Sequence, residues 1–278
     1  MSVNHHHPFS APVRPNPDAL VAQLQAAQQQ AQRGKLRIYF GSNAGVGKTY
    51  AMLAAAQRER QTGLDVLVGL VETHDRAETV QQLHGLKQLP RRSVSYQGKT
   101  LTEFDLDAAL AHRPGVLLLD ELAHSNVAGS RHPKRWQDVQ ELLDAGIDVW
   151  TTLNVQHLES LNDVVSGIVG IQVHETVPDH IFDDADEVIV VDIPPEELLK
   201  RLKAGKVYPL EQAERASRNF FRLGNLLALR ELALRRTADR VDEDMRDYRR
   251  ERAINEVWPA RERLLVCIGG RAGDDALV

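Results

Sequence analysis

Short apolar runs alternate with helix-length segments along most of this chain, and this alternation constrains the fold more than any other feature. The runs are KLRIYFG, DVLVGLV, VLLL, IDVWTTLN and DEVIVV, which begin at Lys35, Asp65, Val116, Ile147 and Asp186. Strands that are buried on both faces and joined by helices form parallel sheets. The sequence therefore predicts an α/β fold, with a mostly parallel sheet and helices on both of its faces.

The helices between these runs are predicted from their apolar spacing and their ends. We expect them over residues 48–61, in HPKRWQDVQELLDAG, in VQHLESLNDVVSGI and in PEELLKRLKAG, with a further short helix in DALVAQLQAAQQQAQRG before the first strand. Pro at the start and Gly at the end of PEELLKRLKAG are typical of helix boundaries.

The segment SNAGVGKT joins the first predicted strand to the helix that follows it. It closes with Gly47, Lys48 and Thr49, as does the phosphate-binding pattern G-x-x-x-x-G-K-[ST] between a strand and a helix. The opening glycine of that pattern is replaced by Ser42, and Gly41 stands one position too early. Because the strand–loop–helix setting is otherwise right, we predict a P-loop NTPase-like fold.

Each residue of this loop has a predicted task. Gly45 and Gly47, on either side of Val46, allow backbone N–H groups to turn inward around an anion, and the helix N-terminus adds its positive dipole end. Lys48 would reach the outer phosphates of a nucleotide, and Thr49 would bind Mg²⁺. These five residues are the predicted nucleotide-binding loop.

A phosphate loop requires an acid on a neighbouring strand, and VLLLDE supplies one. Asp120 follows four apolar residues, at the carboxyl end of a strand, where ligands of such sheets bind. We predict that Asp120 holds Mg²⁺ together with Thr49, directly or through water. Glu121 comes next and is a candidate catalytic base that polarises water, although a role without catalysis explains it equally well.

Other polar side chains end the neighbouring predicted strands. They are Thr151, Thr152 and Asn154 on one strand, and Glu72, His74 and Arg76 on another. The first three suit sensing of a terminal phosphate, and simple strand-end hydrogen bonding accounts for them equally well. The second three can line the same crevice. The polar segment ELAHSNVAGSRHPKR is a candidate lid or partner surface, and we expect structural roles for His124 and His157.

Charge and cysteine content exclude several classes of protein. The formal net charge of -5 argues against a protein that coats nucleic acid, so we expect no nucleic-acid partner. Cys267 is the one cysteine, which permits neither an intrachain disulfide nor a thiolate metal cluster. No run approaches the roughly 18 apolar residues that cross a bilayer.

The pattern changes after Gly205. We expect an almost wholly helical segment from Glu211 to about Ile254, broken at least once, with an apolar stripe of Phe220, Leu223, Leu227, Leu234, Val241 and Met245. The domains predicted on these grounds are a flexible tail with a short helix (1–33), a P-loop nucleotide-binding domain (34–205), a helical extension (206–257) and the start of a truncated further domain (258–278).

Several strings resemble those of one family, in the same order. GVGKTYAML, VETHDRAET, LLLDELAHSN, GSRHPKRWQDVQELL, TTLNVQHLESLND and FFRLGNLLALRELALRRTADRVDEDM are similar to the N-terminal cytoplasmic domain of the KdpD family of sensor histidine kinases for potassium limitation and osmotic stress. The resemblance covers about Gly34 to Arg252. After it, ERLLVCIGG is similar to the opening strand of a universal-stress-protein-like domain. The chain departs from the family in Ser42, Asn43 and Ala44 before GVGKT, and in Asp75.

The resemblance implies an ATP-binding regulatory domain, with ATP and Mg²⁺ as ligands, at the cytoplasmic face of a parent protein in the plasma (inner) membrane. The implied partners are the remaining membrane and kinase domains, a cognate response regulator that acts through the parent, and a second copy in a homodimer. The parent would be a histidine protein kinase. This chain lacks the phosphoacceptor helix and the kinase lobe, so we expect at most a weak ATPase.

Three functions remain open from the residues alone. The first is a regulatory ATP-binding module that passes a signal through the C-terminal helices. The second is a free-standing P-loop ATPase or phosphotransferase, which the position of Glu121 favours. The third is a nucleic-acid motor, which the acidic balance and the chain length disfavour.

Overall fold

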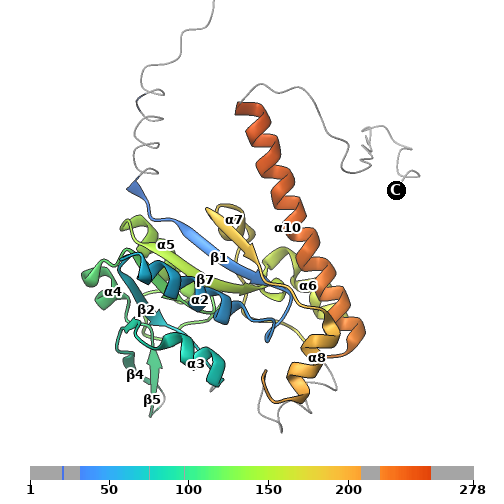
Figure 1. Cartoon of the computed structure of the whole chain (residues 1–278), viewed down its shortest axis with the longest axis horizontal. Coiled ribbons are helices and arrows are strands. Elements are labelled where there is room, and N and C mark those ends of the chain that lie inside the picture. Colours follow the sequence, from blue (N-terminus) through green and yellow to red (C-terminus); the bar gives the residue numbers. More distant parts are fainter. Residues whose placement is uncertain (1–20, 22–31, 75, 97, 208–219, 252–278) are drawn as a thin grey trace, which may run out of the picture. The chain divides into compact units, whose positions relative to one another are not determined.

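The computed structural model describes residues 21, 32–74, 76–96, 98–207 and 220–251 (Figure 1). The chain divides into two compact units, residues 1–237 and 238–278. The described part of the second unit is the C-terminal portion of one helix. Most of the predicted N-terminal helix and the predicted strand ERLLVCIGG lie outside the described residues, and the predicted domain boundaries stay predictions.

Six parallel strands form the central sheet of the first unit. In spatial order they are β3 (Lys87–Gln88), β2 (Val66–Leu70), β6 (Val116–Leu119), β7 (Asp148–Asn154), β1 (Leu36–Gly41) and β8 (Glu187–Val190). Each neighbouring pair runs parallel. The predicted α/β fold with a mostly parallel sheet is therefore confirmed.

Strand β1 lies inside the sheet, between two strands that come much later in the chain. Leu36 pairs with Val149 at its start and Gly41 with Asn154 at its end, while β8 pairs along its other edge. The chain leaves β1 for β2, which lies beyond β7 and β6. Such a reversal of strand order opens a crevice at the carboxyl ends of the strands, where ligands bind in α/β sheets.

Helices cover both faces of the sheet, because successive strand side chains point to opposite sides. On one face, Tyr39, Leu118 and Trp150 pack against Met52 and Leu53 of α2 (Lys48–Gln61), with α3 (Ala77–Leu83) beside it. The other face packs against α4 (Leu106–His112), α5 (Arg135–Asp144), α6 (Asn162–Val169), α7 (Asp179–Asp183) and the first turns of α10 (Leu223–Glu251).

A two-stranded antiparallel hairpin stands apart from the main sheet. It consists of β4 (Arg92–Tyr96) and β5 (Lys99–Glu103), whose side chains are mostly exposed. This hairpin was not predicted from the sequence, because neither of its strands has the buried apolar run that is typical of the other strands.

One predicted helix is shorter than expected. VQHLESLNDVVSGI forms two 3-10 turns, η1 (Val155–His157) and η2 (Glu159–Leu161), and only then the helix α6. The reason is a competing strand-like contact with Val177. The backbone N–H of Val177 donates to the backbone carbonyl of His157, and the backbone N–H of Glu159 donates to the carbonyl of Val177. Backbone groups engaged in this way cannot take part in a continuous helix.

The C-terminal helix differs from its prediction in its buried face. The predicted start at Glu211 lies outside the described residues. The non-helical residues 220–222 interrupt the predicted helical segment, which was expected to be broken, and α10 then continues from Leu223 to Glu251. The predicted apolar stripe is the exposed one, since Leu223, Leu227 and Leu234 are 44%, 48% and 43% exposed. The residues that pack against the body are Leu226, Leu229 and Ala233.

A small separate core lies beside the glycine-rich loop. Val46 of the loop packs with Leu198 and Leu202 of α8 (Pro195–Lys203), with Val207, and with Phe221 and Leu226 near the start of α10. All six side chains are at most 3% exposed. The loop is therefore held by α8 and by the beginning of α10 as well as by the sheet.

Candidate functional site

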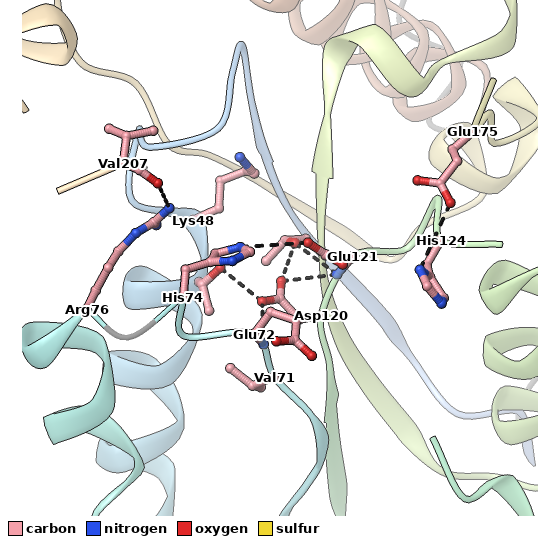
Figure 2. A network of polar contacts seen from close by, with 12 residues as sticks. Lys48, Val71, Glu72, His74, Arg76, Asp120, Glu121, His124, Glu175 and Val207 are labelled. Carbon is pink, nitrogen blue, oxygen red and sulfur yellow. Dashed lines mark hydrogen bonds and ion pairs between the residues drawn. The ribbon is translucent and has the colours of Figure 1, made fainter. Parts of the chain in front are cut away.

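An open pocket of about 810 Å³ lies at the carboxyl ends of the central strands. Its walls are the loop after β1 with the first turn of α2, the residues after β2 and β6, the end of β7, and α8 with the residues that follow it. Figure 2 shows the polar groups at the centre of this pocket, including Lys48, His74, Asp120 and Glu121.

The loop glycines stand where other residues would be strained. Gly45 and Gly47 have φ angles of 88° and 108°, which L side chains rarely adopt. A Cβ on Gly45 would also lie 2.6 Å from a methyl group of Val207. Gly47 is the N-cap of α2, and Val46 between them turns its side chain into the small core. The backbone of the predicted loop thus lines the pocket.

The serine at the usual glycine position causes no visible conflict. Ser42 is buried, it is not among the described residues with positive φ, and its hydroxyl accepts a hydrogen bond from the Asn43 side chain at 3.0 Å. The close approach falls instead on Gly41, where a Cβ would lie 2.8 Å from Val46 and 2.9 Å from the carbonyl oxygen of Val191. The requirement for glycine has therefore moved one position toward the strand.

Lys48 is buried beneath the loop with its ammonium group held in place. Its Nζ donates to the carbonyl oxygen of Asn43 at 2.9 Å, and the residue is 7% exposed. Burial lowers the pKa of Lys48 to about 8; the carboxylate of Asp120 opposes this shift, whereas the nearby charge of Arg76 adds to it. A buried cation of this kind is stabilised when an anion enters the loop.

Asp120 joins the loop to three other elements. Its carboxylate accepts hydrogen bonds from Thr49 at 3.1 Å, from the hydroxyl of Thr152, and from the backbone N–H of Glu121 at 3.1 Å. Its carbonyl oxygen accepts a bond from Arg135 at 2.9 Å. Asp120 is 1% exposed, and this set of donors fixes the direction of its side chain.

The predicted Mg²⁺ ligands lie close enough to share an ion. The hydroxyl of Thr49 and the carboxylate of Asp120 are in contact at the mouth of the loop, and both oxygens are of the type that Mg²⁺ prefers. Mg²⁺ is usually held by one or two protein oxygens together with phosphate oxygens and water. The pair therefore fits an ion that arrives with a nucleotide.

Glu121 and His74 face each other at the pocket wall in strained backbone conformations. Their φ angles are 59° and 49°, in the left-handed region that non-glycine residues seldom adopt. The His74 ring nitrogen lies 3.9 Å from the Glu121 carboxylate, as Figure 2 shows. Partial burial and the charge of Asp120 raise the pKa of Glu121. These features suit a proton acceptor beside the pocket.

Comparison with known proteins identifies the family. The model of the KdpD family, described as the osmosensitive K+ channel His kinase sensor domain, matches residues 32–241. This chain belongs to the KdpD sensor-domain family. Sensor protein KdpD of Escherichia coli K12 is 62% identical over 267 residues, which are 96% of this chain and 29% of that protein.

Two further KdpD relatives are also similar along most of this chain. Sensor protein KdpD of Clostridium acetobutylicum is 50% identical over 256 residues, which are 92% of this chain and 28% of that protein. A Synechocystis relative with a KdpD name is 49% identical over 243 residues, which are 87% of this chain and 65% of that protein. The chain thus spans less than a third of the E. coli and Clostridium relatives. Among its described residues, no helix is both long and apolar enough to span a bilayer.

The strand-end residues of this KdpD-family chain divide between the pocket and other contacts. Thr152 and Asn154 line the pocket, whereas Thr151 is fully buried and does not line it. His74 and Arg76 also line it. The side chain of Glu72 does not; it forms an ion pair with Arg91 at 2.9 Å.

The remaining histidines and the polar segment after Asp120 have structural roles. His124 contacts Glu103 at 3.0 Å, and the Nδ1 of His157 contacts the carbonyl oxygen of Glu175 at 2.7 Å, as expected for hydrogen-bonded histidines outside the site. The segment from Glu121 to Lys134 is closed by the bridge between Ser125 and Lys134, and of its residues only Glu121 lines the pocket. In this structure the segment does not cover the pocket, and its candidate role as a lid or a partner surface stays a prediction.

Two groups of charged residues were missed from the sequence. Lys200, Arg201 and Lys206 line the pocket from α8 and the residues after it. In the sequence they look like the solvated face of an amphipathic helix. Arg135 is 1% exposed and lies 3.5 Å from Glu103, which is 4% exposed. Nothing in the sequence distinguishes this buried pair from surface charges.

Proposed function

We propose that this chain is an ATP-binding regulatory domain of a larger KdpD-type sensor histidine kinase that responds to potassium limitation or osmotic stress. The observation that carries the proposal is the convergence of Lys48, Thr49 and Asp120 at the carboxyl ends of a parallel sheet, around a glycine loop with left-handed glycines. Two cationic or polar groups and one acid in this setting form a site for a phosphate chain with its Mg²⁺.

Each residue has a role in binding. The backbone N–H groups of Gly45 to Lys48 donate to phosphate oxygens, and Lys48 exchanges its bond to the Asn43 carbonyl for a bond to a phosphate. Thr49 and Asp120 would hold Mg²⁺, which would supply positive charge to offset that of the phosphates. Thr152 holds the carboxylate of Asp120 in its direction, and Arg135 holds the backbone carbonyl of the same residue.

The regulatory part of the proposal rests on the small core beside the loop. Val46 belongs to the loop, Phe221 lies just before the C-terminal helix and Leu226 lies in its first turn, yet all three pack in one cluster. A shift of the loop on nucleotide binding acts directly on that cluster, because packed side chains transmit displacement. On this proposal the nucleotide biases the C-terminal helix, and through it the membrane and kinase domains of the parent and its response regulator.

Calorimetric titration with Mg-ATP tests the binding. We expect saturable heat from the wild-type chain and none from Lys48→Ala. Lys99→Ala, a change in the exposed hairpin, is the matched control and should bind as the wild type does. A folded wild-type chain that takes up no Mg-ATP would refute the proposal. In the full-length parent, Lys48→Ala should alter the response to potassium limitation.

Slow hydrolysis of ATP is a second candidate function, favoured by the strained Glu121 beside His74. It predicts phosphate release that is lost in Glu121→Gln and kept in Glu159→Gln, an exposed glutamate away from the pocket. Intact ATP binding with no release above background would rule out hydrolysis and leave the regulatory function standing.

A further inference from the structure

A second cation faces the loop from a different part of the sheet. Arg76 lines the pocket from the connection between β2 and α3, and β2 is separated from β1 by β6 and β7. Lys48 lines the same pocket from the first turn of α2. Two cations from distant segments of the chain therefore line one pocket.

The guanidinium of Arg76 is held at the rim of the pocket by a backbone carbonyl. Its Nη2 donates to the carbonyl oxygen of Val207 at 2.8 Å (Figure 2). Val207 is 2% exposed and packs against Gly45 of the loop. The bond therefore fixes the arginine beside the loop, next to the space that a phosphate chain would enter.

Two cations that line the pocket from α8 and from the residues after it have acidic partners. Lys206 contacts Glu78 at 2.7 Å, and Arg201 lies 3.6 Å from Glu197 while its Nη1 approaches the carbonyl oxygen of Gly45 at 3.5 Å. Arg201 and Lys206 thus have local partners that moderate their attraction for an incoming anion.

Two cations that line one pocket repel each other, and a polyanion bound between them removes that repulsion. A guanidinium binds phosphate through two parallel N–H···O bonds, which makes arginine suited to a terminal phosphate with several free oxygens. A nucleoside diphosphate bound in the glycine loop lacks the terminal phosphate that a guanidinium at the rim of the pocket would contact.

We propose that Arg76 binds the terminal phosphate of the nucleotide and makes this pocket prefer a nucleoside triphosphate over a diphosphate. The inference rests on the proposed ATP-binding function. It adds to that function a residue that distinguishes a nucleoside triphosphate from a diphosphate. It also gives the regulatory domain a means to distinguish ATP from ADP, through a residue that is bonded to the segment next to the loop.

The test compares Mg-ATP with Mg-ADP in calorimetric titrations of the whole chain. Arg76→Ala should weaken binding of Mg-ATP by roughly tenfold to a hundredfold, the usual effect of losing a hydrogen-bonded charge on an anion, and binding of Mg-ADP by less than about threefold. Arg76→Gln, which keeps a polar N–H donor but removes the charge, should show the same selective loss. Arg91→Ala, at the neighbouring ion pair outside the pocket, should change neither affinity.

The outcomes separate this inference from the function on which it rests. Equal losses for the two nucleotides, or no loss in both Arg76→Ala and Arg76→Gln, would overturn the role of Arg76 while wild-type binding of Mg-ATP upheld the nucleotide site. A wild-type chain that binds neither nucleotide would overturn both. Thermal unfolding without nucleotide identifies a variant that has lost its fold, in which case the Arg76→Gln result decides.

Discussion

At the scale of single residues, Asp120 shows how one side chain can organise a site. Its carboxylate receives bonds from α2, through Thr49, and from β7, through Thr152, and its carbonyl receives a bond from α5, through Arg135. The side chain has little freedom left, so that a metal ion bound there, as proposed, would meet an acid that is already oriented. Preorganisation of this kind lowers the entropy cost of binding.

Asp138 gives a residue-scale prediction about pH. It is 4% exposed in α5 and accepts a hydrogen bond from Asn126 at 2.6 Å, and burial raises its pKa to about 6. The folded state therefore keeps a proton that the unfolded state loses near pH 4, so stability falls as the pH rises from about 4 to about 6. Asp138→Asn removes this cost.

We expect Asp138→Asn to be more stable than the wild type above pH 7, by up to about 3 kcal/mol, with the advantage disappearing toward pH 4. Urea unfolding at a series of pH values measures the difference. Asp163→Asn, an exposed aspartate of α6, is the control and should show no such trend. A stability difference that does not change with pH would contradict the prediction.

Residues fixed by chemistry were predictable, and residues fixed by burial were not. Lys48, Thr49 and Asp120 follow from spacing, since phosphate and Mg²⁺ demand those side chains in that order, and the structure brings them together. Whether they bind a nucleotide stays a prediction. The buried state of Arg135 depends on Glu103, which is distant in the sequence. The strained backbone of Glu121 leaves no trace in composition or spacing.

At the scale of secondary-structure elements, α10 shows the limit of periodicity. The helix has apolar residues on two neighbouring stripes. Helical periodicity alone does not show which stripe packs against the core. Leu229 is fully buried, whereas Leu227, two positions earlier, is 48% exposed. The choice is made by the packing partners, here the cores on the sheet face and beside α8.

This choice is testable by paired substitutions. Leu229→Ala should destabilise the chain by about 2–5 kcal/mol, as the loss of a fully buried leucine does, while Leu227→Ala should change the free energy of unfolding by about 0.5 kcal/mol or less. Urea unfolding of both variants provides the measurement. Equal effects of the two changes would show that the exposed stripe is covered in solution.

At the scale of the whole molecule, the sequence predicted the class of fold but not the strand order. Apolar runs separated by helices imply a parallel sheet. Each helix returns the chain to the end of the sheet at which the preceding strand began, so that the next strand runs in the same direction. The order of the strands depends on which helix packs on which face, and several orders satisfy the same pattern. The position of β7 between β1 and β6, which brings Thr152 to Asp120, therefore required the structure.

The proposed nucleotide site predicts a change in global stability. A ligand that binds only the folded state stabilises it by about 2.7 kcal/mol at a hundredfold excess over its Kd. Mg-ATP should therefore raise the melting temperature of the wild-type chain, and EDTA should remove most of the gain because Thr49 and Asp120 then lack their ion. Thermal unfolding measures the shift. A rise of the same size in Lys48→Ala would show that ATP binds elsewhere.

The place of β1 in the sheet sets the order in which a growing chain can fold. Both strands that flank β1 are synthesised long after it, since Leu36 pairs with Val149 and Arg37 with Glu187. Until β7 and β8 have been synthesised, β1 has no partner strand on either side. The glycine loop that follows β1 then lacks the neighbouring strands that would position it. Chaperone contact with a nascent chain is therefore expected to centre on this apolar strand until residues 148–154 have emerged. The glycine loop would then be one of the last parts of the domain to form, although it is synthesised before both strands that flank β1.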